Sequence, residues 1–190
     1  MTRWEPGAPE RLAQAALELY AERGFEQTTV AEIAKRAGLT ERTFFRHYAD
    51  KREVLFAGAG ALQEPMVAAV QEAPDDAAPI DAVADGLRAG AAVLESRRSF
   101  SRQRQAVIAA NTELQERELI KLATLGTALS DALRRRGVAD PTASLTAQAG
   151  IAVFRIAFER WVDESEDREL SELIQESLDE LRVLTAGGRG

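Results

Sequence analysis

A short basic segment carries the side chains in this sequence that are best suited to bind another molecule. Between residues 35 and 52, six basic side chains outnumber two acidic ones. Guanidinium and ammonium groups bind phosphates, and an arginine also forms paired hydrogen bonds with guanine. This segment therefore favours recognition of nucleic acid, although a solvated helix face has the same composition. The basic residues are Lys35, Arg36, Arg42, Arg46, Lys51 and Arg52.

The charge of the whole chain is distributed unevenly. The first 56 of the 190 residues carry nine basic and nine acidic side chains, so the net charge of −7 arises entirely after residue 56. A basic segment joined to an acidic remainder is typical of a DNA reader with a separate control domain.

The residues that the chain lacks exclude several kinds of chemistry. The absence of cysteine excludes a disulfide framework, a thiolate zinc site and a cysteine nucleophile. The single histidine, His47, would have to serve any Ser-His-Asp triad or histidine metal site, and its neighbours are basic and aromatic. The longest apolar run, residues 54–62, is far shorter than the roughly 20 residues of a membrane-spanning helix. We expect a cytoplasmic protein that is not an enzyme and has no cofactor, metal or membrane partner.

Two short predicted helices would position the basic side chains. Residues 29–32, Thr-Val-Ala-Glu, form a capping box that begins a helix over 30–37. Gly38 ends that helix, and Thr40 caps the next one, which starts at residue 41 and ends at 47 or 48. Two short helices joined by a turn that contains glycine predict a helix-turn-helix.

The rest of the chain is also predicted to be helical, which gives an all-α fold of about nine helices. We place a helix-turn-helix DNA-binding domain over residues 1–50 and a larger helical domain for effector binding and dimerisation over 51–190. Pro65 is expected to kink or end the fourth helix. Asp140 is expected to cap the eighth helix, with proline at its first position. The helices outside the helix-turn-helix are predicted over 9–23, 51–71, 80–96, 100–110, 113–136, 141–163 and 169–184.

The eighth predicted helix has an unusually apolar interior. Between residues 149 and 158, only Arg155 is charged or polar. A helix that is apolar on all sides implies burial on all sides. One side can face its own domain, and either the last helix or another subunit would cover the other. The alternative is the central helix of a monomeric bundle.

The segment from about Pro9 to Phe56 resembles the DNA-binding signature of the tetracycline-repressor (TetR) family of bacterial regulators. This resemblance implies a homodimeric transcription repressor that binds a palindromic operator on double-stranded DNA and is released by a small-molecule effector. An activator, or a helical protein-interaction module without a DNA target, are the alternatives. The residues that carry the resemblance are Thr29, Ile33, Ala34, Ala37, Gly38, Thr40, Phe44, Phe45, His47, Tyr48, Lys51 and Leu55.

The polar residues predicted to bind DNA lie in and beside the second short helix. Arg42 lies near its start, where base edges are usually reached, and is expected to read guanine or to contact a phosphate. Three further basic groups are expected to contact phosphates and so to position the helix. Those three are Arg46, His47 and Lys51, and the hydroxyl groups predicted to bind DNA are those of Thr29, Thr40 and Thr43.

The three aromatic residues of this helix have different predicted roles. Phe44 is expected to touch a thymine methyl group, and Phe45 is expected to lie in the core. Family members often have tyrosine at position 45, and phenylalanine cannot make the phosphate hydrogen bond that the resemblance implies there. Tyr48 is expected either to pack in the core or to bind a phosphate.

The resemblance also implies an effector site and a dimer interface in the larger domain. Arg155 is expected to pair with Glu159, with an acid of a second subunit or with an anionic ligand. The basic cluster at residues 97–104 is interpreted as a solvated surface. The candidate effector-binding residues are Phe100, Val107, Leu125, Phe154, Arg155 and Phe158. The candidate interface residues are Ile151, Trp161, Leu170, Leu173, Leu178 and Leu181.

Overall fold

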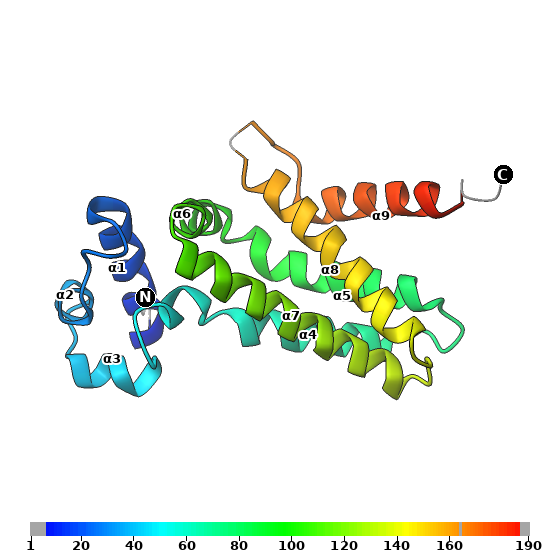
Figure 1. Ribbon diagram of the computed structural model, residues 1–190, viewed down its shortest axis with the longest axis horizontal. Helices are drawn as coiled ribbons and strands as arrows, with labels where there is room; N and C mark the ends of the chain where they lie inside the picture. Colours follow the sequence, from blue (N-terminus) through cyan, green and yellow to red (C-terminus); the bar gives the residue numbers. More distant parts are fainter. Residues whose placement is uncertain (1–6, 164, 187–190) are drawn as a thin grey trace, which may run out of the picture. The chain divides into compact units, whose positions relative to one another are not determined.

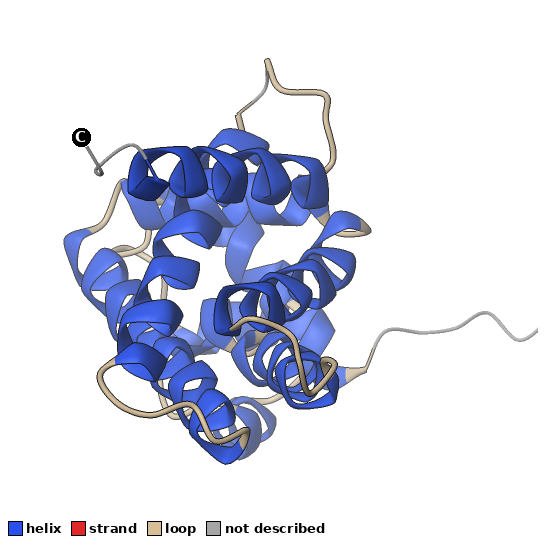
Figure 2. Cartoon of the chain, turned by 90° about the vertical axis from the view of Figure 1, so that its right-hand side faces the viewer, coloured by secondary structure: helices blue, strands red, loops and turns tan. Residues whose placement is uncertain are grey.

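A computed structural model describes residues 7–163 and 165–186 and confirms the predicted all-α fold (Figure 1). These residues form nine α-helices and one short 3-10 helix, joined by loops, with no strand among them (Figure 2). The elements are α1 (Ala8–Arg23), α2 (Val30–Arg36), α3 (Glu41–His47), η1 (Glu53–Phe56), α4 (Ala59–Glu72), α5 (Pro79–Glu95), α6 (Arg98–Ala109), α7 (Thr112–Arg135), α8 (Thr142–Trp161) and α9 (Leu170–Ala186).

The chain divides into two compact units. The first combines Met1–Ala59 with Gln103–Leu119, and the second combines Gly60–Arg102 with Ile120–Gly190. Helices α6 and α7 therefore contribute residues to both units. The domain boundary after residue 50 stays a prediction, since η1 and the connection between α6 and α7 accompany the helix-turn-helix.

In the first unit, local capping begins both helices of the helix-turn-helix as predicted. The Thr29 hydroxyl accepts the Glu32 amide at 3.3 Å, and a Glu32 carboxylate oxygen accepts the Thr29 amide at 2.9 Å. The Thr40 hydroxyl accepts the Thr43 amide at 3.2 Å. Gly38 adopts a φ of +66°, the left-handed conformation that ends α2 at little steric cost.

The core of the first unit places α1 against α2, α3 and η1. Large apolar side chains from each segment fill the space between them without exposure to solvent. Complete burial of a leucine or phenylalanine side chain contributes about 1.5–3 kcal/mol. The most deeply buried of these side chains are Leu12, Leu17, Phe25, Ile33 and Phe44.

The fourth helix begins later than the sequence predicted and ends within one residue of its predicted end. Residues 53–56 form η1, and α4 starts only at Ala59. Helix α4 then continues past Pro65 to Glu72, so this proline does not end it. A proline inside a helix costs about 3 kcal/mol. Burial of the neighbouring Met66 and Val70 in the core of the second unit offsets that cost.

The second unit is built around close contacts among α5, α8 and α9. Two glycines permit the tight packing of its helices. A Cβ atom on Gly86 of α5 would lie 2.9 Å from the Met66 carbonyl oxygen, and one on Gly150 of α8 would overlap a Val83 methyl group. Larger residues at either position would push the helices apart.

The start of α8 differs by one residue from the prediction. Pro141 occupies the N-cap position, and the helix begins at Thr142. The Asp140 carboxylate instead accepts the Ser144 hydroxyl at 3.0 Å and pairs with Arg134 at 2.7 Å. None of the described helices is both long enough and apolar enough to cross a membrane.

Candidate nucleic-acid interface

The outer face of α3 presents polar and aromatic side chains that the fold itself does not use. Arg42, Phe45, Arg46 and His47 are all exposed. Within the described residues, Arg42 makes no side-chain hydrogen bond or ion pair, and Arg46 only approaches His47, at 3.4 Å. The guanidinium groups of this face are therefore available to an external acceptor such as a phosphate or a base edge.

Other basic residues of the segment are held by neighbouring carboxylates. Arg36 donates two hydrogen bonds of 2.9 Å to Glu22, and Arg52 donates one of 2.8 Å to Asp50. The hydrogen bonds from Arg36 lower the pKa of Glu22. The charges of Arg36 and Arg52 are therefore paired with carboxylates of the fold, whereas those of Arg42 and Arg46 on α3 are not.

Lys51 requires a correction. Its ammonium nitrogen donates to the carbonyl oxygens of Phe25, Thr28 and Glu26 at 2.9, 3.1 and 3.3 Å. These three acceptors match the three N–H donors of a lysine, which leaves none for the phosphate that we predicted. Lys51 instead fixes the connection between α1 and α2, and we remove it from the interface.

The aromatic residues of α3 also differ from their predicted roles. Phe44 is completely buried and cannot reach a thymine, whereas Phe45, which we expected in the core, is 55% exposed. Tyr48 is buried one turn after Phe44, and its hydroxyl donates to the Pro9 carbonyl at 3.0 Å. Burial raises the pKa of Tyr48. Phe44 and Tyr48 therefore hold α3 to the core, and Phe45 lies on the outer face.

The three threonines keep a structural role that leaves them accessible. Thr29 and Thr40 are exposed helix caps, and Thr43 is half-buried in the first turn of α3. Their contact with DNA stays a prediction.

The six candidate effector-binding residues are divided between the two units. Val107 lies in the first unit, and the other five lie in the second. Among these five, the rings of Phe154 and Phe158 stack with centroids 6.0 Å apart. Arg155 is exposed and has no ion pair within the described chain, so the burial that would demand a partner is not present.

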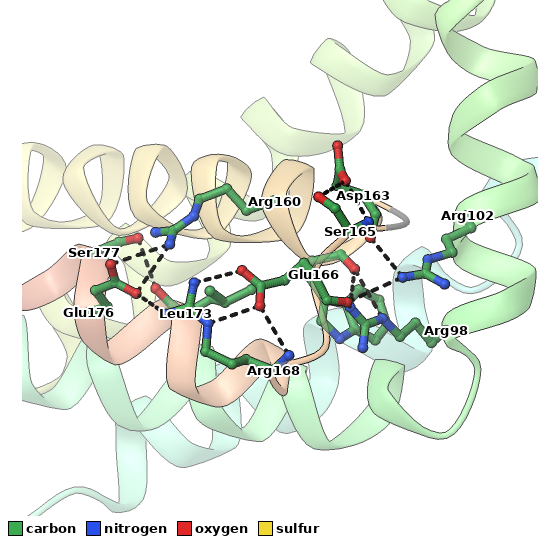
Figure 3. A network of polar contacts seen from close by, with 11 residues as sticks. Arg98, Arg102, Arg160, Asp163, Ser165, Glu166, Arg168, Leu173, Glu176 and Ser177 are labelled. Carbon is green, nitrogen blue, oxygen red and sulfur yellow. Dashed lines mark hydrogen bonds and ion pairs between the residues drawn. The ribbon is translucent and has the colours of Figure 1, made fainter.

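Sequence reasoning missed the role of the arginines at the start of α6, which we had interpreted as solvated surface (Figure 3). Arg98 donates to the Trp161 carbonyl at 2.8 and 3.0 Å, and its guanidinium lies 5.4 Å from the Trp161 ring centroid. Arg102 donates to the Asp163 carbonyl at 2.7 Å. Cations at a helix C-terminus satisfy its free carbonyl groups, so both arginines fix the end of α8.

An open surface depression of about 390 Å³ lies beside the end of α8 and the residues that follow it. Hydrogen bonds from Arg168 lower the pKa of the Glu166 carboxyl at its edge to about 2. Five of the six residues that line the depression are polar or charged, and none of the six belongs to the predicted effector site. The lining residues are Ile156, Glu159, Arg160, Asp163, Ser165 and Glu166.

The predicted dimer-interface residues are also corrected by the structure. Five of them, Ile151, Trp161, Leu170, Leu173 and Leu178, are buried in the core of the second unit, and Leu181 is half-buried. The apolar residues of α8 and α9 that remain exposed are instead Leu145, Ile156, Val183 and Leu184, at 67, 48, 70 and 76%. The helix periodicity identified an apolar face, and α5 rather than a second chain covers much of it.

Two domain families match most of the chain. Residues 12–57 match the family described as bacterial regulatory proteins, tetR family. Residues 77–185 match the MftR C-terminal domain. The first match covers α2 and α3 and most of α1, and the second covers α5 to α8 and nearly all of α9.

Individual proteins resemble the chain in part or in fold. TcmR, an HTH-type transcriptional regulator of Streptomyces glaucescens, is 39% identical over 80 residues, which span 42% of this chain and only 35% of TcmR. FadR from Bacillus subtilis in complex with stearoyl-CoA has a TM-score of 0.64 and 21% identity, covering 90% of this chain and 96% of FadR. The complex of SmeT with triclosan has a TM-score of 0.63 and 20% identity, covering 93 and 90% of the two chains. At these identities the two structures show a common fold.

Proposed function

Because the chain belongs to the tetR family of bacterial regulatory proteins, and is therefore a DNA-binding transcription regulator, we propose that it is a homodimeric repressor released from its operator by a small molecule. The observation that carries this proposal is the outer face of α3, where an unpaired Arg42 and an exposed Phe45 lie beside Arg46 and His47. Within the described residues, the Arg42 side chain makes no hydrogen bond. Operator binding would place the protein in the cytoplasm, where bacterial DNA lies.

In this proposal, some side chains of α3 contact bases and determine the sequence that is bound, and others contact phosphates and position the helix. Arg42 lies in the first turn of α3 and reads a guanine through paired hydrogen bonds. Arg46 and His47 lie in the last turn and contact phosphates, which fixes the register of the helix on the duplex. Phe45 supplies an apolar contact to the thymine methyl group, in place of the buried Phe44.

A second copy of the chain covers the exposed aliphatic residues of α8 and α9. Leu145 and Ile156 of α8, with Val183 and Leu184 of α9, expose about half or more of their surface. Exposed apolar groups of this size mark interaction surfaces when they gather on neighbouring elements, and α8 and α9 pack against each other. A two-fold dimer presents two α3 helices to a near-palindromic operator, with half-sites about 34 Å apart or a multiple of that distance.

The effector is a small and largely apolar molecule that binds in the second unit. The stacked rings of Phe154 and Phe158, with the Trp161 ring 5.8 Å from that of Phe158, form an aromatic cluster in the core of the second unit against which such a ligand would pack. The bound molecules named for the two similar structures, stearoyl-CoA and triclosan, both have large apolar parts. The ligand releases DNA only by binding the DNA-incompetent state more tightly, since equal affinity for both states shifts neither.

Selection of binding sites from a random duplex library tests the proposal as a whole. The chain should enrich a near-palindromic sequence, and its affinity for that sequence should fall steeply with salt concentration. No enrichment of any sequence would contradict the proposal and favour the helical protein-interaction module. A reporter gene controlled by the selected operator separates the repressor from the activator, because expression should rise when the regulator is deleted.

A further inference from the structure

The last part of α6 and the first part of α7 belong to the same compact unit as the helix-turn-helix. Residues 103–119 are grouped with the first 59 residues of the chain. Their apolar side chains Ile108 and Leu114 are almost fully buried. This part of the chain is more than 50 residues from α3 in sequence, so specific contacts must hold it there.

Arg104 supplies the most concentrated of these contacts. Its Nε donates to the Leu55 carbonyl oxygen at 2.7 Å, and its Nη1 donates to Glu118 at 2.9 Å. The guanidinium carbon lies 4.9 Å from the centroid of the Phe56 ring. One partly buried side chain of α6, 18% exposed, therefore joins α7 and η1.

The environment of Arg104 shows that its charge is sustained by these partners. Burial lowers the pKa of Arg104 because desolvation disfavours the charged form, and the charge of Glu118 opposes that effect. A buried cation of this kind is retained only where hydrogen bonds and a countercharge compensate its desolvation. Arg117 pairs with Glu53 in a second link between α7 and η1.

The segment that Arg104 holds is the direct continuation of α3. Between α3 and η1, the Tyr48 hydroxyl is fixed to Pro9, and the Lys51 carbonyl accepts the Tyr20 hydroxyl at 2.6 Å. Further along this segment, Glu53 pairs with Arg117 of α7, and the Leu55 carbonyl accepts from Arg104 of α6. Residues 48–56 are thus held by α1 at Tyr48 and Lys51, by the loop after α1 through the Lys51 ammonium, and by α6 and α7 at Leu55 and Glu53.

We propose that Arg104 is a positioning residue for operator binding, which holds residues 48–56, and through them α3, in the geometry that fits DNA. This inference rests on the proposed function and assigns to it a residue remote from the DNA-facing side chains. Base readout demands side chains placed to within about half an ångström, so a small shift of the segment is enough to weaken it.

Two variants separate positioning from stability. Arg104→Met keeps the apolar stem but leaves the Glu118 carboxylate without its cation, so the melting temperature should fall. The double variant Arg104→Met with Glu118→Leu removes that unpaired charge, and its melting temperature should recover. The Leu55 carbonyl has lost its donor in both variants. Both should therefore bind the selected operator at least roughly fivefold more weakly than the wild-type chain at 25 °C.

Arg97→Met is the matched control. Arg97 is an exposed arginine immediately before α6. Within the described residues its side chain makes no hydrogen bond and only an exposed cation–π contact with Phe100, 5.1 Å from the ring centroid, so its loss should change both measurements little. Wild-type operator affinity in the stable double variant would overturn the positioning role and leave the proposed function intact. A wild-type chain that does not distinguish the operator from a scrambled duplex would overturn both.

Discussion

Arg42 and Phe45 offer two different means of recognising a base pair from one face of α3. The guanidinium of Arg42 provides paired donors that match the acceptors of guanine, whereas the Phe45 ring matches only the methyl group of thymine. Both side chains are exposed, and the buried ring of Phe44 supports Phe45 edge-on, with centroids 5.4 Å apart. Hydrogen bonding and apolar contact are therefore separable by experiment.

The role of Phe45 predicts a dependence on single methyl groups of the operator. Replacing thymines by deoxyuridine removes only the 5-methyl group, and wild-type affinity should fall at one position in each half-site. Phe45→Ala should bind more weakly and should no longer respond to that replacement, since the contact is already lost. Titrations of four protein–DNA combinations by fluorescence anisotropy give the coupling directly. Equal sensitivity of both proteins to deoxyuridine would refute the contact.

The residues of α3 show which structural features can be predicted from the sequence and which cannot. Thr40 and Gly38 were placed correctly because capping depends on neighbours within three residues. The inward and outward roles of Phe44 and Phe45 were exchanged, because a helix of only seven residues has too few apolar positions to fix its phase. Lys51 was misassigned for another reason: its carbonyl partners lie more than 20 residues away in sequence.

At the scale of elements, α8 and α9 use most of their apolar surface within their own unit. Trp161 and Leu173 are completely buried, whereas Ile156 and Leu145 of α8 remain exposed. Apolar periodicity predicted the existence of these helices and their approximate bounds. It could not tell which apolar residues a neighbouring helix covers, because that depends on contacts with α5.

Ile156→Asp tests whether the exposed side of α8 forms a dimer interface. A charged group placed in a contact between two chains is costly to desolvate, so the variant should be monomeric and should bind the operator more weakly. Sedimentation velocity and anisotropy measure the two effects. Leu119→Asp is the control, since Leu119 is 58% exposed on α7, outside the proposed interface. A wild-type chain that sediments as a monomer yet binds the operator with full affinity would exclude the dimer.

At the scale of the whole molecule, two compact units share helices α6 and α7. The sequence predicted a small DNA-reading part and a larger helical part. It did not predict that residues 103–119 accompany the helix-turn-helix, since that grouping rests on pairs such as Arg104 and Leu55, 49 residues apart. Long-range polar pairs of this kind have no periodic signature, so they emerge only from the folded chain.

The proposed control by a small molecule predicts linked effects on stability and DNA binding. Stearoyl-CoA and triclosan serve as probes, together with a panel of apolar metabolites. A true effector should raise the melting temperature and weaken operator binding by about 5- to 150-fold, the range of a coupling of 1–3 kcal/mol. Phe158→Ala should reduce both effects. A compound that stabilises the protein without changing its DNA affinity would count against this mechanism.

The most direct test of the central claim is the affinity of wild-type and Arg42→Ala proteins for the selected operator and for a scrambled duplex of equal length, at one salt concentration. The wild-type protein should prefer the operator by roughly a thousandfold or more. Arg42→Ala should lose about 1–3 kcal/mol per half-site on the operator and almost nothing on the scrambled duplex. Equal affinity of the wild-type protein for both duplexes would contradict the claim that the outer face of α3 reads DNA sequence.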